Sequence, residues 1–357
     1  MDLAGPIGRH FARSADVGET SATMRERAST TQISLAMVAA RAGVSIATVS
    51  RIVNGETRRA SAQTVERVRA AVDLLGYRPN HVGRALRRRQ SRIVAMLAPN
   101  LDNPAMAAIA VSTEAALRAA GYVMILCDTH DRADLQDEYL QAMRSQLVQG
   151  YVMVSAVSSA ELRDAVARGE PIVYVSRRSP EGDGAYVGID NRAAGATAAD
   201  HLLDRGVAEP AVIFPAQGSS STKERVAGFV ARLGKRGIAP ERLRQAMAPG
   251  LSHLQAGYDA AKILVAPDGP GWPEGLLCVS DLMAYGAFRL ACEQHVAIPS
   301  ACLIMGIDAN PLNAWVAPWL TSVRIPYEDF GPRVVEQLKL LWSGGVAGDS
   351  LLPHSLP

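Results

Sequence analysis

Residues 41–91 read RAGVSIATVSRIVNGETRRASAQTVERVRAAVDLLGYRPNHVGRALRRRQS, and this stretch decides the fold of the N-terminal part of the chain. Ser45 can cap a helix from Ile46 to about Val53, because a serine oxygen accepts a hydrogen bond from the first turn. The apolar side chains at three-to-four spacing should pack inward: Val49, Ile52 and Val53. The other side chains of this helix can face outward: Ala47, Thr48, Ser50 and Arg51.

Two further short helices are expected around this one. Ser34 can cap a helix that Gly43 stops, and Ser61 can cap another that runs through Leu75 and ends at Gly76. Two helices joined by a tight glycine turn are typical of a helix-turn-helix, whose second helix enters the major groove of DNA. The pattern therefore predicts a small all-α DNA-binding head.

Basic charge is concentrated in the same segment. Residues 31–92 contain twelve arginines and three acidic residues, a net charge of +9, whereas the whole chain of 357 residues carries only +2. Such an island is expected of a nucleic-acid module, since phosphate contacts supply most of the sequence-independent binding energy. A solvated basic face would have the same composition.

Two patterns in this segment are specific: GVSxxTVSRxxN from residue 43 and YxPN from residue 77. With the helices around them they resemble the DNA-binding head of the LacI/GalR (lactose-repressor) family of bacterial transcriptional regulators. The resemblance implies a protein that binds an operator through its second helix and responds to a small molecule.

The resemblance makes Arg51 the main base-reading side chain, and Ile46 and Ala47 the positions whose identity varies with operator sequence. Arginine on guanine is the commonest specific contact in the major groove and is worth about 1–3 kcal/mol of discrimination. Three polar residues at the same helix would contact phosphates or fix the docking on DNA: Thr48, Ser50 and Asn54. For Thr48 and Ser50, helix packing alone is the other interpretation. The full set that the resemblance assigns to DNA is Ser34, Ser45, Ile46, Ala47, Thr48, Ser50, Arg51, Asn54, Arg58, Asn80, Gly83, Arg84 and Leu86.

The segment HVGRALRRR, residues 81–89, matches the family's hinge helix, which orders on operator DNA. Leu86 matches the leucine that wedges into a minor-groove step and kinks the duplex. Gly83 departs from the alanine usual in this stretch and should weaken the helix by about 0.5–1 kcal/mol. Folding of this hinge is therefore expected to depend more on DNA than a hinge with alanine at this position would.

From residue 92 onward, apolar strands alternate with helical stretches, which predicts a doubly wound parallel sheet. A second series of strands and helices begins near residue 186 and predicts a second lobe. Four segments in this order resemble the periplasmic-binding-protein-like effector core of the same family: YVGIDNRAAG, SSSTKERVAGF, SDLMAYGA and GIDANPLNAWVAPWLTSVRIPYEDFG. The fold class expected is thus an all-α head followed by two doubly wound parallel-sheet α/β lobes.

The expected domain boundaries follow from these segments. Residues 1–29 form an N-terminal extension expected to be disordered, 30–79 the helix-turn-helix domain, 80–91 the hinge, and 92–357 the effector-binding and dimerisation core. The first lobe is expected to combine residues 92–188 with 321–343, so that TSVRIP returns to the first sheet, and the second lobe to combine 189–320 with the C-terminal tail. Crossings near residues 189 and 320 and near the C-terminus would form a hinge for lobe closure.

The same resemblance supplies the candidate effector site. Arg225 matches the arginine that clamps an effector hydroxyl or carboxylate, and Asp308 matches the acid that accepts bonds from effector hydroxyls. Other polar residues follow strand ends and match effector positions: Asp102, Asn103, Ser280 and Asp281. An Asp and an Arg that face each other suit a polyhydroxylated ligand, although a purely structural Arg–Asp bridge would give the same pattern.

Several function classes lack the residues they need. The chain has no GxSxG, GxGxxG or P-loop pattern, and its four scattered cysteines and seven histidines show no metal-ligand spacing. We therefore expect no enzymatic activity, no metal and no cofactor. No run is long and apolar enough for a membrane span, and residues 1–30 lack a secretory signal, so a cytoplasmic protein is expected.

The function predicted is a sequence-specific transcriptional regulator, with repression as the commoner family behaviour. A homodimer would bind a pseudo-palindromic operator, and a sugar or sugar derivative between the core lobes would control it. A tetramerising coiled coil is not expected, because the tail has no heptad pattern. The alternative is a sugar-binding transport-type protein without regulatory DNA binding, and a family member that responds to a nucleobase or a protein partner also remains open.

Overall fold

The computed structural model describes residues 33–77, 91–182, 184–250 and 252–356. The chain divides after residue 80 into two compact units, the head and the core. The expected extension at residues 1–29 lies outside the described residues, as does the expected hinge apart from residue 91.

The head consists of three helices, each started by a serine. The helices are α1 (Leu35–Ala42), α2 (Ile46–Val53) and α3 (Ala62–Leu75), and the side chains of the serines before them accept backbone N–H groups of their first turns. Gly43 and Gly76 end α1 and α3 in the left-handed conformation that glycine adopts without strain, with φ of 62° and 61°. One valine from each helix is fully buried in the centre of the head: Val38, Val49 and Val68.

The axes of α1 and α2 are bent by 104° relative to each other, which is the geometry of a helix-turn-helix. No single helix in the described ranges is both long and apolar enough to cross a membrane; α1 and α2 reach that length and composition only when counted together across this bend.

The first lobe of the core is built on a six-stranded parallel sheet in the order β11-β5-β4-β3-β1-β2. Its strands are β1 (Ile93–Ala98), β2 (Val123–Asp128), β3 (Tyr151–Val154), β4 (Ile172–Val175), β5 (Ala185–Ile189) and β11 (Asp349–Leu352). Alternate residues of β1 enter two different cores: Val94, Met96 and Ala98 pack in one, and Ala95 and Leu97 in the other. Both faces of the sheet are therefore covered, as a parallel sheet requires.

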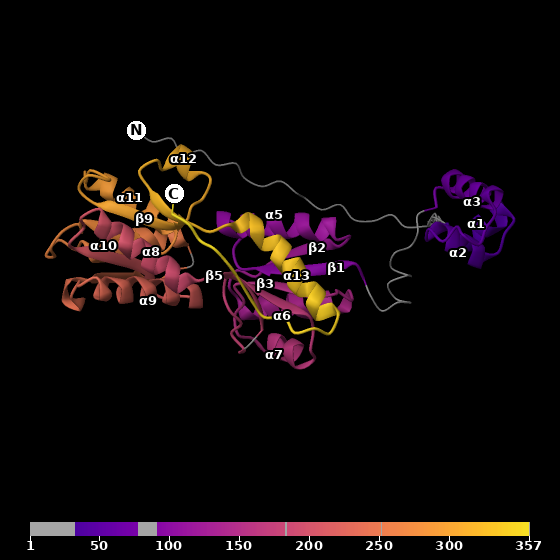
Figure 1. The fold of residues 1–357 in the computed structure, drawn as a ribbon, viewed down its shortest axis with the longest axis horizontal. Helices are drawn as coiled ribbons and strands as arrows, with labels where there is room; N and C mark the ends of the chain where they lie inside the picture. The colour runs from indigo at the N-terminus through magenta and orange to yellow at the C-terminus, as the bar shows by residue number, and fades with distance from the viewer. Residues whose placement is uncertain (1–32, 78–90, 183, 251, 357) are drawn as a thin grey trace, which may run out of the picture. The chain divides into compact units, whose positions relative to one another are not determined.

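Helices cover both faces of this sheet (Figure 1). Helices α5 (Pro104–Ala119) and α13 (Phe330–Trp342) pack together on one face, and α6 (Ala133–Ser145) and α7 (Ala160–Ala167) on the other.

The second lobe has a five-stranded parallel sheet in the order β10-β9-β8-β6-β7. Its strands are β6 (Pro210–Pro215), β7 (Arg244–Ala248), β8 (Gly275–Cys278), β9 (Leu303–Asp308) and β10 (Thr321–Arg324). Helices α8 (Asn191–Asp204) and α9 (Ser220–Lys235) cover one face, while α10 (His253–Leu264) and α11 (Asp281–Glu293) cover the other (Figure 1). The shorter elements are η1 (Pro240–Arg242), α12 (Asn313–Val316) and η2 (Tyr327–Asp329). The expected fold class, a helical head and two parallel-sheet lobes, is confirmed.

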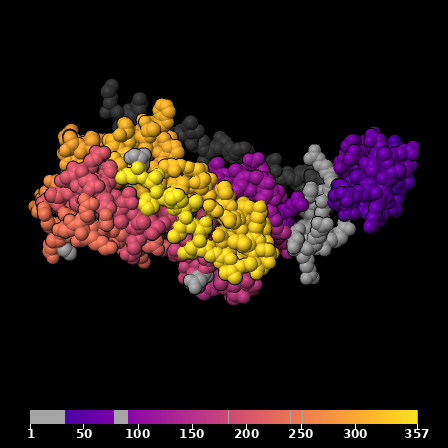
Figure 2. All heavy atoms as spheres, in the orientation of Figure 1, coloured from indigo at the N-terminus to yellow at the C-terminus, as the bar shows by residue number. Residues whose placement is uncertain are grey.

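Two assignments of segments to lobes were wrong. TSVRIP does not return to the first sheet: β10 pairs with β9 in the second sheet, and the chain crosses only after Arg324. The C-terminal tail does not belong to the second lobe alone, because β11 pairs with β5 at the edge of the first sheet before Ser355 bridges to Arg324. Figure 2 shows these last residues on the surface, running from the first lobe towards the second.

Glycines allow the helix pairs of the second lobe to approach closely. A Cβ on Gly228 of α9 would lie 1.9 Å from the backbone oxygen of Arg192 in α8, and a Cβ on Gly195 of α8 would lie 2.0 Å from the backbone oxygen of Arg225. These contacts hold α8 and α9 backbone to backbone, and so fix where α9 carries Arg225.

We expect Gly228→Ala to destabilise the core by about 1–3 kcal/mol, because the new methyl group cannot fit without moving α8. Gly234→Ala on the same helix is the matched control: a Cβ there would meet nothing within 4 Å beyond its chain neighbours and its own helix backbone, and helix propensity alone predicts a gain of up to about 1 kcal/mol. Urea unfolding of the two variants measures both effects. Equal stability of the two variants would contradict the close packing of α8 on α9.

Candidate DNA-binding surface and effector site

The outer face of α2 carries the residues expected to read DNA. Ile46, Ala47 and Arg51 are exposed, and Ile46 has 51% of its surface accessible although it is apolar. The Arg51 Nε donates to the backbone oxygen of Ala47 at 3.2 Å, which directs the guanidinium along the helix surface.

The hydroxyl groups on α2 already have partners within the head. The oxygens of Thr48 and the capping Ser45 lie 2.9 Å apart, and Asn54 Nδ2 donates to Ser50 Oγ at 3.5 Å. Ser34 and Ser45 cap their helices, and Arg58 is exposed in the loop before α3. The packing interpretation of Thr48 and Ser50 therefore has direct support, and a phosphate contact would add to it. Four hinge residues of the expected set lie outside the described residues: Asn80, Gly83, Arg84 and Leu86.

In the core, strained backbone lies at the carboxyl ends of strands. Six non-glycine residues of the described chain have positive φ within three residues of a strand end: His130, Asp131, Ser155, Ser176, Asp308 and Ala309. Such conformations cost about 1–3 kcal/mol each and cluster at functional sites. Ligands of doubly wound sheets bind at these same strand ends.

Arg225 is held rigidly from the second lobe. Its side chain is almost fully buried; Nε donates to Asn191 Oδ1 at 2.9 Å, and one terminal nitrogen donates to the backbone oxygen of Val279 at 2.7 Å. That same nitrogen lies 3.9 Å from Asp308 Oδ1. The structure thus brings together the two residues that the sequence singled out most strongly.

Asp308 ends β9 with φ of 139° and is buried. The Tyr327 hydroxyl donates to its Oδ1 at 2.7 Å. Burial raises the Asp308 pKa to about 7, against the opposing effect of the Arg225 charge. The carboxyl group therefore changes charge near neutral pH.

Asp281 serves the interior of the second lobe. Its Oδ1 accepts from Ser322 Oγ at 2.5 Å, and its Oδ2 accepts from the backbone N–H of Asn310 and from Asn313 Nδ2, both at 2.8 Å. Burial raises its pKa. Both oxygens are occupied, so Asp281 positions the turn after β9.

Of the other residues expected to bind the effector, two cap helices and one is exposed. Ser280 caps α11, accepting from the backbone N–H of Met283, and Asn103 caps α5, accepting from the backbone N–H of Ala105 at 3.0 Å. Asp102 is exposed just before that cap.

Several residues beside these were missed from the sequence. Asn191 and Tyr327 orient Arg225 and Asp308, and both lay in quoted motifs without an assigned role. His253 Nδ1 lies 2.9 Å from Ser280 Oγ. In the first lobe Arg177 donates to Asp131 at 3.2 Å, and the charges of both residues act on the pKa of His253 in the second lobe.

We name these six residues the interlobe site: Asp131, Arg177, Arg225, His253, Ser280 and Asp308. The group offers fixed N–H donors beside a carboxyl acceptor at the carboxyl ends of both sheets. Such a set can orient a polar small molecule through several directed hydrogen bonds.

Comparisons with known proteins agree with this organisation. Residues 34–80 match the model for bacterial regulatory proteins of the lacI family, and residues 199–353 match a periplasmic binding protein-like domain. The HTH-type transcriptional regulator MalR of Streptomyces coelicolor is 32% identical over 313 residues, which cover 85% of this chain and 88% of MalR.

Two solved structures are also similar. The lac repressor dimer bound to operator and the anti-inducer ONPF matches with a TM-score of 0.80 over 91% of this chain and 97% of that chain, at 24% identity, which shows the fold alone. The complex of the transcriptional regulator CelR with cellobiose matches with a TM-score of 0.66 at 25% identity, over 91% of this chain and 98% of that chain. From the head, the core and the MalR relative together, the chain belongs to the lacI family of DNA-binding transcriptional regulators and is not an enzyme.

Proposed function

We propose that this regulator is a homodimeric repressor of a pseudo-palindromic operator, and that a carbohydrate-type effector bound at the interlobe site changes its affinity for DNA. The observation that carries this proposal is the capped helix-turn-helix with Arg51 exposed on α2, attached to a core that holds Arg225 and Asp308 together at strand ends.

The DNA-binding part of the proposal follows from the outer face of α2. An exposed arginine on a recognition helix can bond guanine O6 and N7, and two such helices of a dimer reach major grooves about one helical turn apart. A pseudo-palindromic operator follows from the twofold symmetry.

The dimer is supported by apolar surface that the described chain leaves uncovered. Strand β2 is an edge of the first sheet and exposes Val123 and Leu126, although parallel strands are normally covered on both faces. On α12, Trp315 is 85% exposed. In Figure 1, α12 and α5 both lie along the upper edge of the core. A second copy of the chain is the proposed cover, since the similar lac repressor structure is a dimer.

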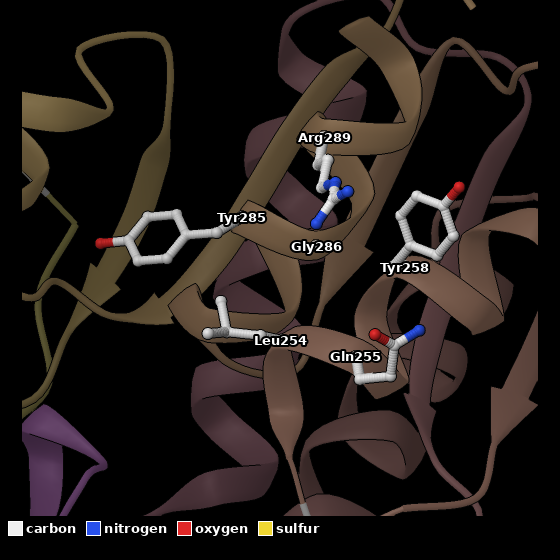
Figure 3. A pocket seen from close by; sticks show the side chains of 6 residues that line it. All are labelled: Leu254, Gln255, Tyr258, Tyr285, Gly286 and Arg289. Carbon is white, nitrogen blue, oxygen red and sulfur yellow. The ribbon is translucent and has the colours of Figure 1, made fainter. Parts of the chain in front are cut away.

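A pocket of about 360 Å³ lies between α10 and α11 of the second lobe (Figure 3). Its lining is Leu254, Gln255, Tyr258, Tyr285, Gly286 and Arg289. Figure 3 shows Leu254 and Gln255 of α10 opposite Arg289 of α11. The Tyr285 hydroxyl bonds Asn313 of α12, so this pocket adjoins the exposed helix and would belong to the same dimer surface.

The effector part of the proposal is supported by donors and an acceptor fixed side by side, and by the cellobiose complex of the similar CelR. The deciding experiment is a mobility shift of the full chain on the DNA upstream of its own gene, at two salt concentrations and with a panel of sugars. Salt-sensitive, sequence-selective binding that one sugar changes supports the proposal. Sugar binding without selectivity for DNA sequence would refute it.

We expect Arg51→Ala to lose about 1–3 kcal/mol of discrimination at one guanine of each half-site, because the bidentate contact is removed. Arg69→Ala removes an equal charge from the exposed surface of α3 and is the control; it should weaken binding to all sequences alike. Binding to operators substituted at single positions measures the difference. Unchanged base preference in Arg51→Ala would contradict the assignment.

Effector binding should depend on pH through Asp308. If effector hydroxyls donate to its ionised carboxylate, binding is favoured above the pKa of about 7 and disfavoured below it, since the proton must first leave. We expect the affinity for the sugar found in the screen to fall about tenfold from pH 8 to pH 6, with proton release on binding. In Asp308→Asn the affinity should be weaker and flat with pH. Titration calorimetry in two buffers measures both, and an unchanged pH profile in the variant counts against this role.

Trp315→Arg should weaken the dimer, because a buried tryptophan anchor is typically worth about 2 kcal/mol or more, which is about thirtyfold in the dissociation constant. Val346→Arg is the control, since Val346 is 96% exposed and lies in the loop after α13. Analytical ultracentrifugation reports the dissociation constant. A dimer of normal strength in Trp315→Arg would exclude α12 from the interface.

A further inference from the structure

His253 lies at the start of α10 and bonds the residue before α11. It is the first residue of α10, where Ser252 already serves as the cap, and its ring is half-buried. Its Nδ1 lies 2.9 Å from Ser280 Oγ, which is the one side-chain hydrogen bond of this imidazole within the described chain.

The direction of the bond to Ser280 decides which ring nitrogen carries the proton. Ser280 Oγ accepts the backbone N–H of Met283 at 3.4 Å, and its hydroxyl proton can be donated to His253 Nδ1. An imidazole that accepts at Nδ1 carries its proton on Nε2 in the neutral form. In that arrangement His253 Nε2 is a hydrogen-bond donor.

The ring is neutral at physiological pH. Burial lowers the pKa of His253 most, the charges of Arg177 and Arg225 lower it too, and Asp131 raises it; together these effects bring the pKa to about 4. The charged groups come from both lobes. Because protonation requires a pH near 4, His253 keeps one protonation state between pH 5.5 and 8.

The surroundings of His253 favour negative charge on a ligand. Two guanidinium groups act on the ring against one carboxylate, and that carboxylate, Asp131, is bonded to Arg177. Arg225 donates to the backbone oxygen of Val279, the residue before Ser280, so its guanidinium and the imidazole meet at the end of the same strand, β8. The net effect of these side chains at the ring is therefore that of positive charge. Asp308, whose Oδ1 lies 3.9 Å from the Arg225 guanidinium, suits ligand hydroxyls.

We propose that His253 Nε2–H, together with Arg225 and Arg177, recognises an anionic oxygen group, a carboxylate or a phosphate, on the effector. This inference rests on the proposed effector site and specifies its ligand: a sugar derivative that presents hydroxyl groups to Asp308 and an anionic group to His253. Ser280 acts as the positioning residue that sets the tautomer of the ring.

The test uses the full chain with three probes: D-gluconate, D-glucose 6-phosphate and the neutral D-glucose. Nitrogen-15 NMR of the histidine rings follows His253, assigned by its loss in His253→Phe. We expect the free protein to show His253 neutral and protonated on Nε2 from pH 5.5 to 8. We also expect gluconate or glucose 6-phosphate to shift this signal and to bind at least about tenfold more tightly than glucose, as a hydrogen bond to a charged group predicts.

Two variants separate recognition from packing. His253→Phe keeps an aromatic ring without a donor and should lose the preference for the anionic probe over glucose. His253→Gln places an amide N–H near the position of Nε2 and should restore most of the preference. A structural role for the ring would instead change the affinities of all probes together.

The outcomes also separate this inference from the proposed function. If neither anionic probe shifts His253, or if glucose binds as tightly as both, the inference is overturned. If a neutral sugar alone releases the operator, regulation stands and the anion site falls. If an anionic probe shifts His253 but leaves operator binding unchanged, the anion site stands and effector control fails.

Discussion

The core depends on the way the Arg225 guanidinium is satisfied. A charge this deeply buried needs hydrogen-bond acceptors, and the side chain of Asn191 and the backbone oxygen of Val279 provide two of them. These bonds join α8, α9 and the end of β8 at one point. The close contact of Gly195 with the backbone of Arg225 fixes how closely α9 approaches α8 there. Asp308, 3.9 Å away, then has a charge partner without a full hydrogen bond, so its carboxyl group remains available to a ligand.

Polar side chains at helix starts have two uses in this protein. Ser45 caps α2 and also bonds Thr48, and Ser280 caps α11 and also holds His253. A cap is required by the free N–H groups of the first turn, and this requirement places a hydroxyl at a defined position. Recognition groups can then be oriented by the cap at little additional cost in stability. For this reason the interlobe site lies where strands end and helices begin.

The sequence predicted the local features well and the long-range ones poorly. Caps and glycine stops are decided by a few neighbouring residues, so the head was predicted almost to the residue, and the resemblance supplied Arg225 and Asp308. By contrast, β7 was missed because RQAMA has no apolar run, as an edge strand allows. The placement of β10 and β11 depends on which sheet offers a free edge. His253 and Tyr327 matter only through partners distant in sequence, and no local pattern marks them.

The position of β11 has a consequence for how the chain is made. The first lobe draws its last helix and an edge strand from residues 330–352, whereas every strand of the second lobe lies between residues 210 and 324. During synthesis the second lobe can therefore close before residues 330–352 are made, while β5 keeps an open edge until β11 emerges. Completion of the first lobe is thus a later event, and it requires contacts of long sequence separation, which form slowly. A regulator built in this order completes its first lobe only after its DNA-binding head has been synthesised.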